Sequence, residues 1–185
     1  MSKGRLEGFF DAILAIIMTI MVLEIKTPKT PDVGSWAELI VPLIAFLISF
    51  FSLSTLWYSH HELLKNVHNI SYRSVLLNIV LLAWVSLVPV VTAWVAEFPT
   101  HPWPERFFAI ETLGWILLLE LLIRSIKADN PGINVSVTAF AWWSFSAIMV
   151  VIIFPFPYSG LAIAAVLGVR IPSIWLGQAR RARKQ

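Results

Sequence analysis

The chain contains no cysteine among its 185 residues. Disulfide bonds and thiolate metal sites are therefore excluded. Charged residues are also scarce, because Asp, Glu, Lys and Arg together make up 14% of the sequence, whereas an ordinary soluble domain has about 25%. Hydrophobic residues make up 58%. This composition predicts an integral membrane protein.

The sequence also lacks the short motifs of common enzyme and channel classes. It has no phosphate-binding loop, Gly-x-Ser-x-Gly elbow, His-Glu-x-x-His pair or Gly-rich dinucleotide motif. His60, His61 and His68 are close in sequence, but they lack the carboxylate and histidine spacing of a zinc or diiron centre. The Thr-Val-Gly-Tyr-Gly filter of common potassium channels is absent too. We therefore expect no enzyme, no cofactor and no bound metal.

What the sequence does contain is a series of apolar runs, each near the roughly 20 residues that cross a bilayer as a helix. Six transmembrane helices are predicted, at about residues 6–25, 36–63, 71–95, 103–126, 135–154 and 158–177. The runs are continuous rather than alternating, which favours helices over a membrane barrel. The fold class is thus an all-α integral membrane protein with a single domain over residues 1–185. Pro89 should kink the third span, and Gly160, Ala164 and Gly168 form a small-residue seam in the sixth.

The basic residues predict the orientation. Six spans place eleven of the fourteen on one side: Lys3, Arg5, Lys65, Arg73, Arg124, Lys127, Arg170, Arg180, Arg181, Arg183 and Lys184. Only Lys26, Lys29 and Arg106 fall on the other side. Positive residues stay in the cytoplasm, so both termini are predicted to be cytoplasmic. We interpret the basic tail, residues 178–185, as an anchor at anionic lipid rather than as a nucleic-acid site.

A few polar side chains lie inside the predicted spans, where ionisable groups are costly and tend to be paired or functional. Asp11 lies in the first span, and Trp57, His60 and His61 close the second span on the same predicted side. Together with Arg5, a carboxylate, an imidazole and a guanidinium could satisfy one another there. Such a cluster is either a structural clip or part of the functional machinery.

The fourth predicted span carries three further ionisable residues. Glu120 and Arg124 are four residues apart, so they should pair on one helix face. Glu111 has no partner nearby in the sequence. It must face another helix or change its protonation, which makes it a candidate proton site.

The opening stretch, "RLEGFFDAILAIIMTIMVLEIK" from Arg5 to Lys26, resembles the Arg-x-x-x-Phe-Ser-Asp signature and first helix of the endosomal and lysosomal potassium channel family, in its six-span prokaryotic form. Arg5, Phe9 and Asp11 match the signature, and Phe10 stands at the serine position. The resemblance extends more loosely to "LWYSHH" and "LLNIVLLAWVSLVP".

The resemblance implies a homotetramer in the prokaryotic plasma membrane that passes monovalent cations, chiefly potassium. The first helix of each subunit would line a central pore. Ile16 would form its narrowest hydrophobic ring, Ile20 and Leu23 would form further rings, and Thr19 would offer hydroxyls. Glu24 would concentrate cations at the outer mouth, while Arg5, Phe9, Asp11, Trp57, His60 and His61 would hold the inner end.

The residues alone leave this assignment open. Positions 16, 20 and 23 follow one helical stripe, but in a helix that is apolar all round any such stripe can be drawn. A proton-conducting or proton-coupled transporter would use Glu111 or Asp11 as a proton carrier. A non-conducting assembly protein would have the same composition.

Overall fold

The computed structural model describes residues 2–65 and 67–132, and every regular element in these ranges is helical. The elements are α1 (Lys3–Leu23), the short 3₁₀ helix η1 (Val33–Trp36), α2 (Ala37–Leu64), α3 (Tyr72–Val85), α4 (Val88–Glu97) and α5 (Pro102–Asp129). The predicted fifth and sixth spans, the basic tail and the Gly160, Ala164 and Gly168 seam lie outside the described residues.

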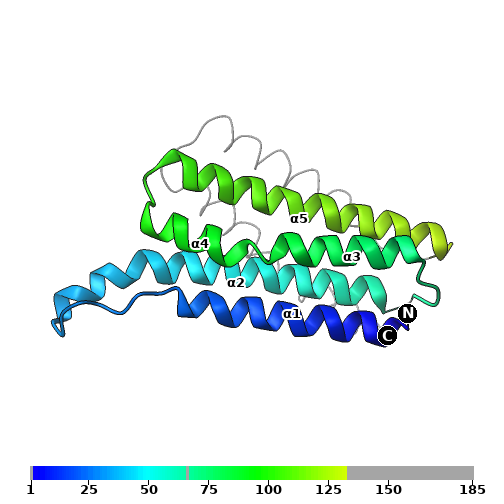
Figure 1. The fold of residues 1–185 in the computed structure, drawn as a ribbon, viewed down its shortest axis with the longest axis horizontal. Coiled ribbons are helices and arrows are strands. Elements are labelled where there is room, and N and C mark those ends of the chain that lie inside the picture. The colour runs from blue at the N-terminus through cyan, green and yellow to red at the C-terminus, as the bar shows by residue number, and fades with distance from the viewer. Residues whose placement is uncertain (1, 66, 133–185) are drawn as a thin grey trace, which may run out of the picture.

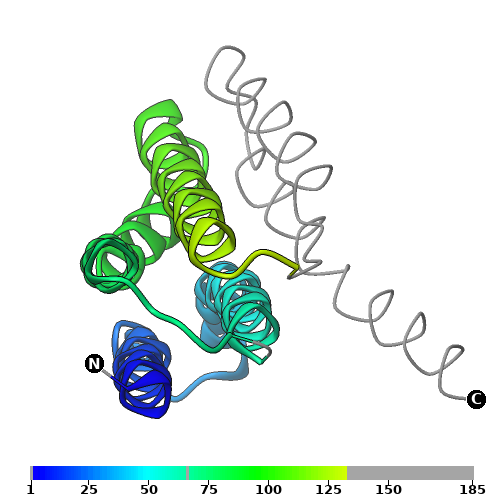
Figure 2. The same cartoon turned by 90° about the vertical axis from the view of Figure 1, so that its right-hand side faces the viewer.

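The helices run roughly along one common direction, as Figure 1 shows. The beginning of α1, the end of α2, the beginning of α3 and the end of α5 lie together at one end of the bundle (Figure 1). This is the end that the basic residues predict to be cytoplasmic, and we refer to it as the inner end. Viewed end-on in Figure 2, α1 and α5 lie on opposite sides of the group. α2 packs against α1 and α4, and α5 packs along α3 and α4.

Three helical segments are long and apolar enough to cross a membrane: Lys3–Leu23, Val33–Leu64 and Tyr72–Glu97. They coincide with the first three predicted spans, although α1 ends at Leu23, two residues before the predicted boundary at position 25. The fourth predicted span falls on α5, which has 28 residues. α5 is long enough to span a membrane. It is not among the three apolar segments, because it carries several acidic and basic residues.

The third predicted span is broken where its proline requires a break. α3 ends at Val85 and α4 begins at Val88, with Pro89 in its first turn. A proline has no N–H, and its ring collides with the carbonyl four residues earlier, which here belongs to Val85. The Ser86 hydroxyl donates to the Leu82 carbonyl at 2.8 Å next to the break. The kink expected from the sequence is confirmed.

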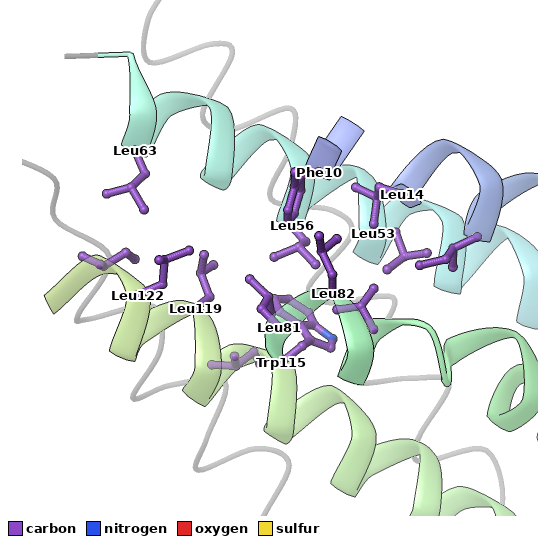
Figure 3. Close-up of a cluster of buried hydrophobic side chains, with 14 of the residues drawn as sticks. Phe10, Leu14, Leu53, Leu56, Leu63, Leu81, Leu82, Trp115, Leu119 and Leu122 are labelled. Carbon is purple, nitrogen blue, oxygen red and sulfur yellow. The ribbon is translucent and has the colours of Figure 1, made fainter. Parts of the chain in front are cut away.

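The hydrophobic core lies between α1, α2, α3 and α5. Side chains of α1, α2, α3 and α5 meet there, as Figure 3 shows for Phe10, Leu14, Leu53, Leu56, Leu63, Leu81, Leu82, Trp115, Leu119 and Leu122. The approach of α3 to α5 depends on Gly114, because a Cβ at that position would lie 2.3 Å from the Trp84 indole. The same indole N–H donates to the Glu111 carbonyl at 2.8 Å. Trp84, the largest side chain of α3, therefore contacts the backbone of α5 directly.

Asn130 fixes the inner end of α5. Its side-chain oxygen accepts from the backbone N–H groups of His68 and Asn69 at 3.2 and 3.0 Å. Its amide nitrogen donates to the carbonyls of Asn69 and Ile126 at 2.8 and 2.9 Å. One side chain therefore closes the last turn of α5 and holds the connection between α2 and α3 against it.

Candidate functional site

The first helix has two faces of similar chemistry and opposite surroundings. One face is buried in the core and consists of Leu6, Phe10, Leu14, Ile17 and Met21. The other carries the predicted pore residues Ile16, Ile20 and Leu23, whose exposed fractions are 56%, 41% and 79%. Their spacing of four and three residues keeps them on one stripe of the helix. The described part of the chain therefore leaves this stripe uncovered.

Thr19 lies on the exposed side of α1, beside the stripe. Its hydroxyl donates to the carbonyl of Ile16, one turn earlier, at 2.8 Å. This is the local bond that threonine commonly makes inside a helix. Because the hydroxyl acts as the donor, its oxygen keeps lone pairs that can accept from water or face a cation.

Glu24 is the C-terminal cap residue of α1 and is exposed. It lies at the outer end of the helix, one residue beyond Leu23. Its backbone N–H bonds to the carbonyl of Val22. The residue is exposed to solvent at this end of α1.

At the inner end, Asp11 is held by a tryptophan. The Trp57 indole N–H donates to Oδ1 of Asp11 at 2.9 Å. The His61 ring stacks on the Trp57 ring with a centroid distance of 5.8 Å and an interplanar angle of 14°. Within the described ranges Asp11 has no ion pair. Asp11, Trp57 and His61 form one cluster, but in the described part of the chain no histidine or arginine lies within ion-pair distance of Asp11.

His60 belongs to a separate contact. Its Nε2 lies 2.8 Å from Oδ1 of Asn78 on α3, and both side chains are buried. The Phe10 ring lies parallel to the imidazole, with a centroid distance of 3.6 Å and an interplanar angle of 4°. Phe10, which stands at the serine position of the signature, therefore packs on the imidazole ring of His60. Asn78 was missed from the sequence, although a single amide in the run "LLNIVLL" was a signal for it.

Arg5 and Phe9 do not join the inner-end contacts. Both are exposed, and among the described residues Arg5 makes no ion pair. Among the described residues of one chain the guanidinium does not pair with Asp11, and helix geometry gives the reason. Six residues of helix turn a side chain through about 600°, so Arg5 and Asp11 lie about 120° apart around α1.

α5 carries the predicted pair of Glu120 and Arg124 and the candidate proton site Glu111. Nε of Arg124 lies 2.9 Å from Oε1 of Glu120, which confirms this pair. Glu111 is buried, and among the described residues its Oε1 has no hydrogen-bond partner. Within residues 2–65 and 67–132, no group of three or more His, Asp or Glu side chains is arranged to hold a metal ion.

These features define a class: a helical membrane protein whose first helix is anchored by one apolar face and exposes another. Residues 5–89 match the family model described as endosomal/lysosomal potassium channel TMEM175. The chain is 36% identical to a potassium channel from Chryseobacterium sp. (strain P1-3) over 143 residues, which are 72% of this chain and 71% of that protein. The chain therefore belongs to the TMEM175 family.

Two further comparisons extend this result. The fold resembles the crystal structure of a lysosomal potassium-selective channel TMEM175 homolog from Chamaesiphon minutus, with a TM-score of 0.78 and 27% identity. That match covers 90% of this chain and 94% of the other. The chain is also 31% identical to the mouse endosomal/lysosomal proton channel TMEM175 over 117 residues, which are 57% of this chain and 23% of the mouse protein.

Proposed function

We propose that this protein is a potassium-permeable cation channel, formed by a homotetramer in which α1 of each subunit lines a central pore. The observation that carries the proposal is the apolar stripe of Ile16, Ile20 and Leu23, which the described chain leaves uncovered. An apolar stripe can face lipid, but it can equally face copies of itself around an axis. The family membership and the potassium-channel names of the bacterial relatives favour the second arrangement.

The stripe would act as the constriction. A narrow neck of branched apolar side chains excludes water, and an ion in it loses its hydration shell at a large cost in free energy. A small widening readmits water and lets ions pass. Ile16 would form the narrowest ring, and Ile20 and Leu23 would form wider rings toward the outer end. No carbonyl filter is needed in this mechanism.

Polar groups next to the stripe would assist cations. The Thr19 oxygen keeps lone pairs free while its proton is bound to the Ile16 carbonyl. Four such oxygens around an axis could replace part of a lost hydration shell. The carboxylate of Glu24, one residue beyond the stripe, would raise the local concentration of cations at the outer mouth.

The contacts at the inner end would hold the pore helices. The Asp11–Trp57 bond ties α1 to α2, and Phe10 packs on His60, which is tied to α3. These contacts fix how α1 is rotated about its own axis. Because the stripe is a set of side chains on one face of α1, this rotation decides whether the stripe points to the pore. We assign this cluster a scaffold role.

The proposed location is the plasma membrane of a prokaryote, with both termini in the cytoplasm. The inner end carries Lys3, Lys65, Arg73, Arg124 and Lys127. The opposite end of the described bundle carries Lys26, Lys29 and Arg106. This asymmetry has the sign of the positive-inside rule, and the bacterial sources of the similar potassium channels agree with the location.

The test is ion flux into liposomes that contain the purified protein. We expect a potassium current that follows the potassium gradient alone. Ile16→Asn should raise the conductance or loosen the selectivity, because an amide keeps the neck wet. Ile40→Asn is a matched control, since Ile40 on α2 has the same exposed fraction of 56%. The current should not change in this control. An unchanged current in Ile16→Asn would remove Ile16 as the gate.

Proton conduction is a second candidate, favoured by the names of the mammalian relatives. The same liposomes with an internal pH dye and no potassium would detect it. A proton-coupled transporter would also need a buried carrier, and Glu111 is buried with an Oε1 that has no hydrogen-bond partner in the described ranges. Glu111→Gln should then abolish transport, and potassium flux should require a proton gradient. A plain potassium channel should show neither effect.

A further inference from the structure

A groove between α1 and α2 lies away from the predicted pore stripe of Ile16, Ile20 and Leu23. Its volume is about 200 Å³, and it is lined by Asp11, Leu14, Ala15, Met18, Ser54 and Trp57. The α1 residues of the lining are spaced by three, one and three positions, so they share one side of α1, which lies roughly opposite the stripe that carries Ile16 and Ile20. The groove is mostly apolar, with a carboxylate at its inner end.

The groove contains the carboxylate of Asp11. Within the described part of the chain Asp11 accepts a single hydrogen bond, from the Trp57 indole to Oδ1 at 2.9 Å. Among the described residues no cation lies within ion-pair distance of it. Asp11 is exposed in the described chain, so its carboxylate is accessible to a ligand in the groove. A carboxylate beside apolar walls is electrostatically complementary to a cation that also has an apolar part.

The other polar atoms of the groove fit the same ligand. The Ser54 hydroxyl donates to the Phe50 carbonyl at 2.8 Å, so its oxygen remains an acceptor. An ammonium group carries only donors, which suits a carboxylate and a hydroxyl oxygen. The Trp57 ring adds an aromatic surface that attracts cations.

The volume sets the size of the ligand. A dry apolar cavity of about 150 Å³ accepts one benzene molecule. A groove of about 200 Å³ can therefore hold one aromatic ring with a short alkylammonium chain, but not a drug-sized molecule, which occupies pockets of about 300–1,000 Å³.

We propose that the groove lined by Asp11, Ala15, Met18, Ser54 and Trp57 is a binding site for small arylalkyl amines in their ammonium form. The ring lies against Leu14, Ala15 and Met18, and the ammonium group pairs with Asp11. The site lies between two helices of one subunit and is distinct from the axial stripe. The proposal concerns ligand binding, and it does not depend on whether the protein conducts ions.

The experiment uses the full-length protein in detergent micelles and observes the ligand by fluorine NMR. The probes are 4-fluorophenethylammonium and the neutral 2-(4-fluorophenyl)ethanol, which has a similar size. We expect saturable binding of the ammonium probe, at least tenfold tighter than that of the alcohol. Asp11→Asn retains an acceptor for Trp57 and removes the charge. It should reduce the affinity for the ammonium probe to that for the alcohol.

Two further variants separate this site from others. Ala15→Leu fills the groove without changing any charge and should weaken both probes, so the proposal can be tested even if Asp11→Asn does not fold. Ile16→Asn, on the opposite side of α1 from the groove, should bind the ammonium probe as the unmodified protein does.

Several results would overturn the proposal. Equal affinity for both probes, or unchanged affinity in both Asp11→Asn and Ala15→Leu, would mean that the probe partitions into the micelle. Loss of binding in Ile16→Asn would place the amine in the central pore. No saturable binding to the assembled protein would mean that a neighbouring copy or a lipid chain covers the groove. The ion flux in liposomes is measured independently of these binding results, so the channel proposal is tested separately.

Discussion

Phe9 and Phe10 are neighbours in the sequence with the same side chain and opposite surroundings. Phe10 is fully buried against His60, whereas Phe9 is 46% exposed. The whole of α1 continues this division between a face that packs in the core and a face that the described chain leaves uncovered. Hydrophobicity alone does not separate the two faces, because Ile, Leu and Phe occur on both. What separates them is whether the partner is the same chain or something outside it.

The largest effect should come from truncating the buried member of this pair. Phe10→Ala removes the ring stacked on His60 and leaves a cavity between α1, α2 and α3. Substitutions of buried Phe by Ala in soluble proteins cost about 3–5 kcal/mol. We expect the lower end, about 3 kcal/mol, because lipid is as apolar as the core and the loss is mainly one of packing. The measurement is the midpoint of SDS-induced unfolding in mixed micelles.

Phe9→Ala is the control for this prediction. It removes the same ring from the exposed face, so we expect a change within about 0.5 kcal/mol. If both variants lost the same stability, the two faces of α1 would not differ in the way described. A large loss in Phe9→Ala would show instead that this face is covered by a neighbouring copy with a tight contact.

The comparison also shows what the sequence could predict. Continuous apolar runs predicted α1, α2 and the segment of α3 and α4. In lipid the backbone N–H and C=O groups must bond to one another, and a helix is the simplest structure that allows this. Pro89 predicted the break, since the loss of its N–H acts locally. The helical pair of Glu120 and Arg124 was predicted for the same reason, because it depends only on 3.6 residues per turn.

The partners across helices could not be predicted in this way. Asp11 bonds to Trp57, and His60 bonds to Asn78. These choices depend on how each helix is rotated about its axis, and a helix that is apolar all round gives no signal for that rotation. Arg5 was expected near Asp11 because the two are close in sequence, although helical geometry turns them apart. The groove beside Asp11 likewise arises only when α1 and α2 are packed.

A smaller effect is expected from the polar contact beneath Phe10. Asn78→Ala leaves Nε2 of the buried His60 without a partner, and an unsatisfied buried polar group costs about 1–3 kcal/mol. The same SDS unfolding measurement applies. Loosening His60 should also loosen the ring that packs on it, so Asn78→Ala combined with Phe10→Ala should cost less than the sum of the two single variants.

Ser59→Ala is the control for Asn78. The Ser59 hydroxyl donates to the carbonyl of Thr55 in its own helix, so its removal strands no buried group, and the stability should change by less than about 0.5 kcal/mol. Strict additivity of the Asn78 and Phe10 variants would contradict the view that His60 links α1 to α3.

The smallest effect is expected on the exposed face, at Thr19. Thr19→Val keeps the shape and removes the hydroxyl, so stability should change by less than about 0.5 kcal/mol. If the hydroxyl oxygen faces the ions, potassium conductance should fall, but by less than tenfold, which corresponds to about 1.4 kcal/mol in the barrier. The dewetted neck supplies most of the barrier in either protein.

Thr19→Ser restores the oxygen and should restore the current. Equal currents in all three proteins would mean that the oxygen does not face the ions. A loss in Thr19→Ser as large as in Thr19→Val would mean that the methyl group matters, and the role of this position would then be packing between copies of α1.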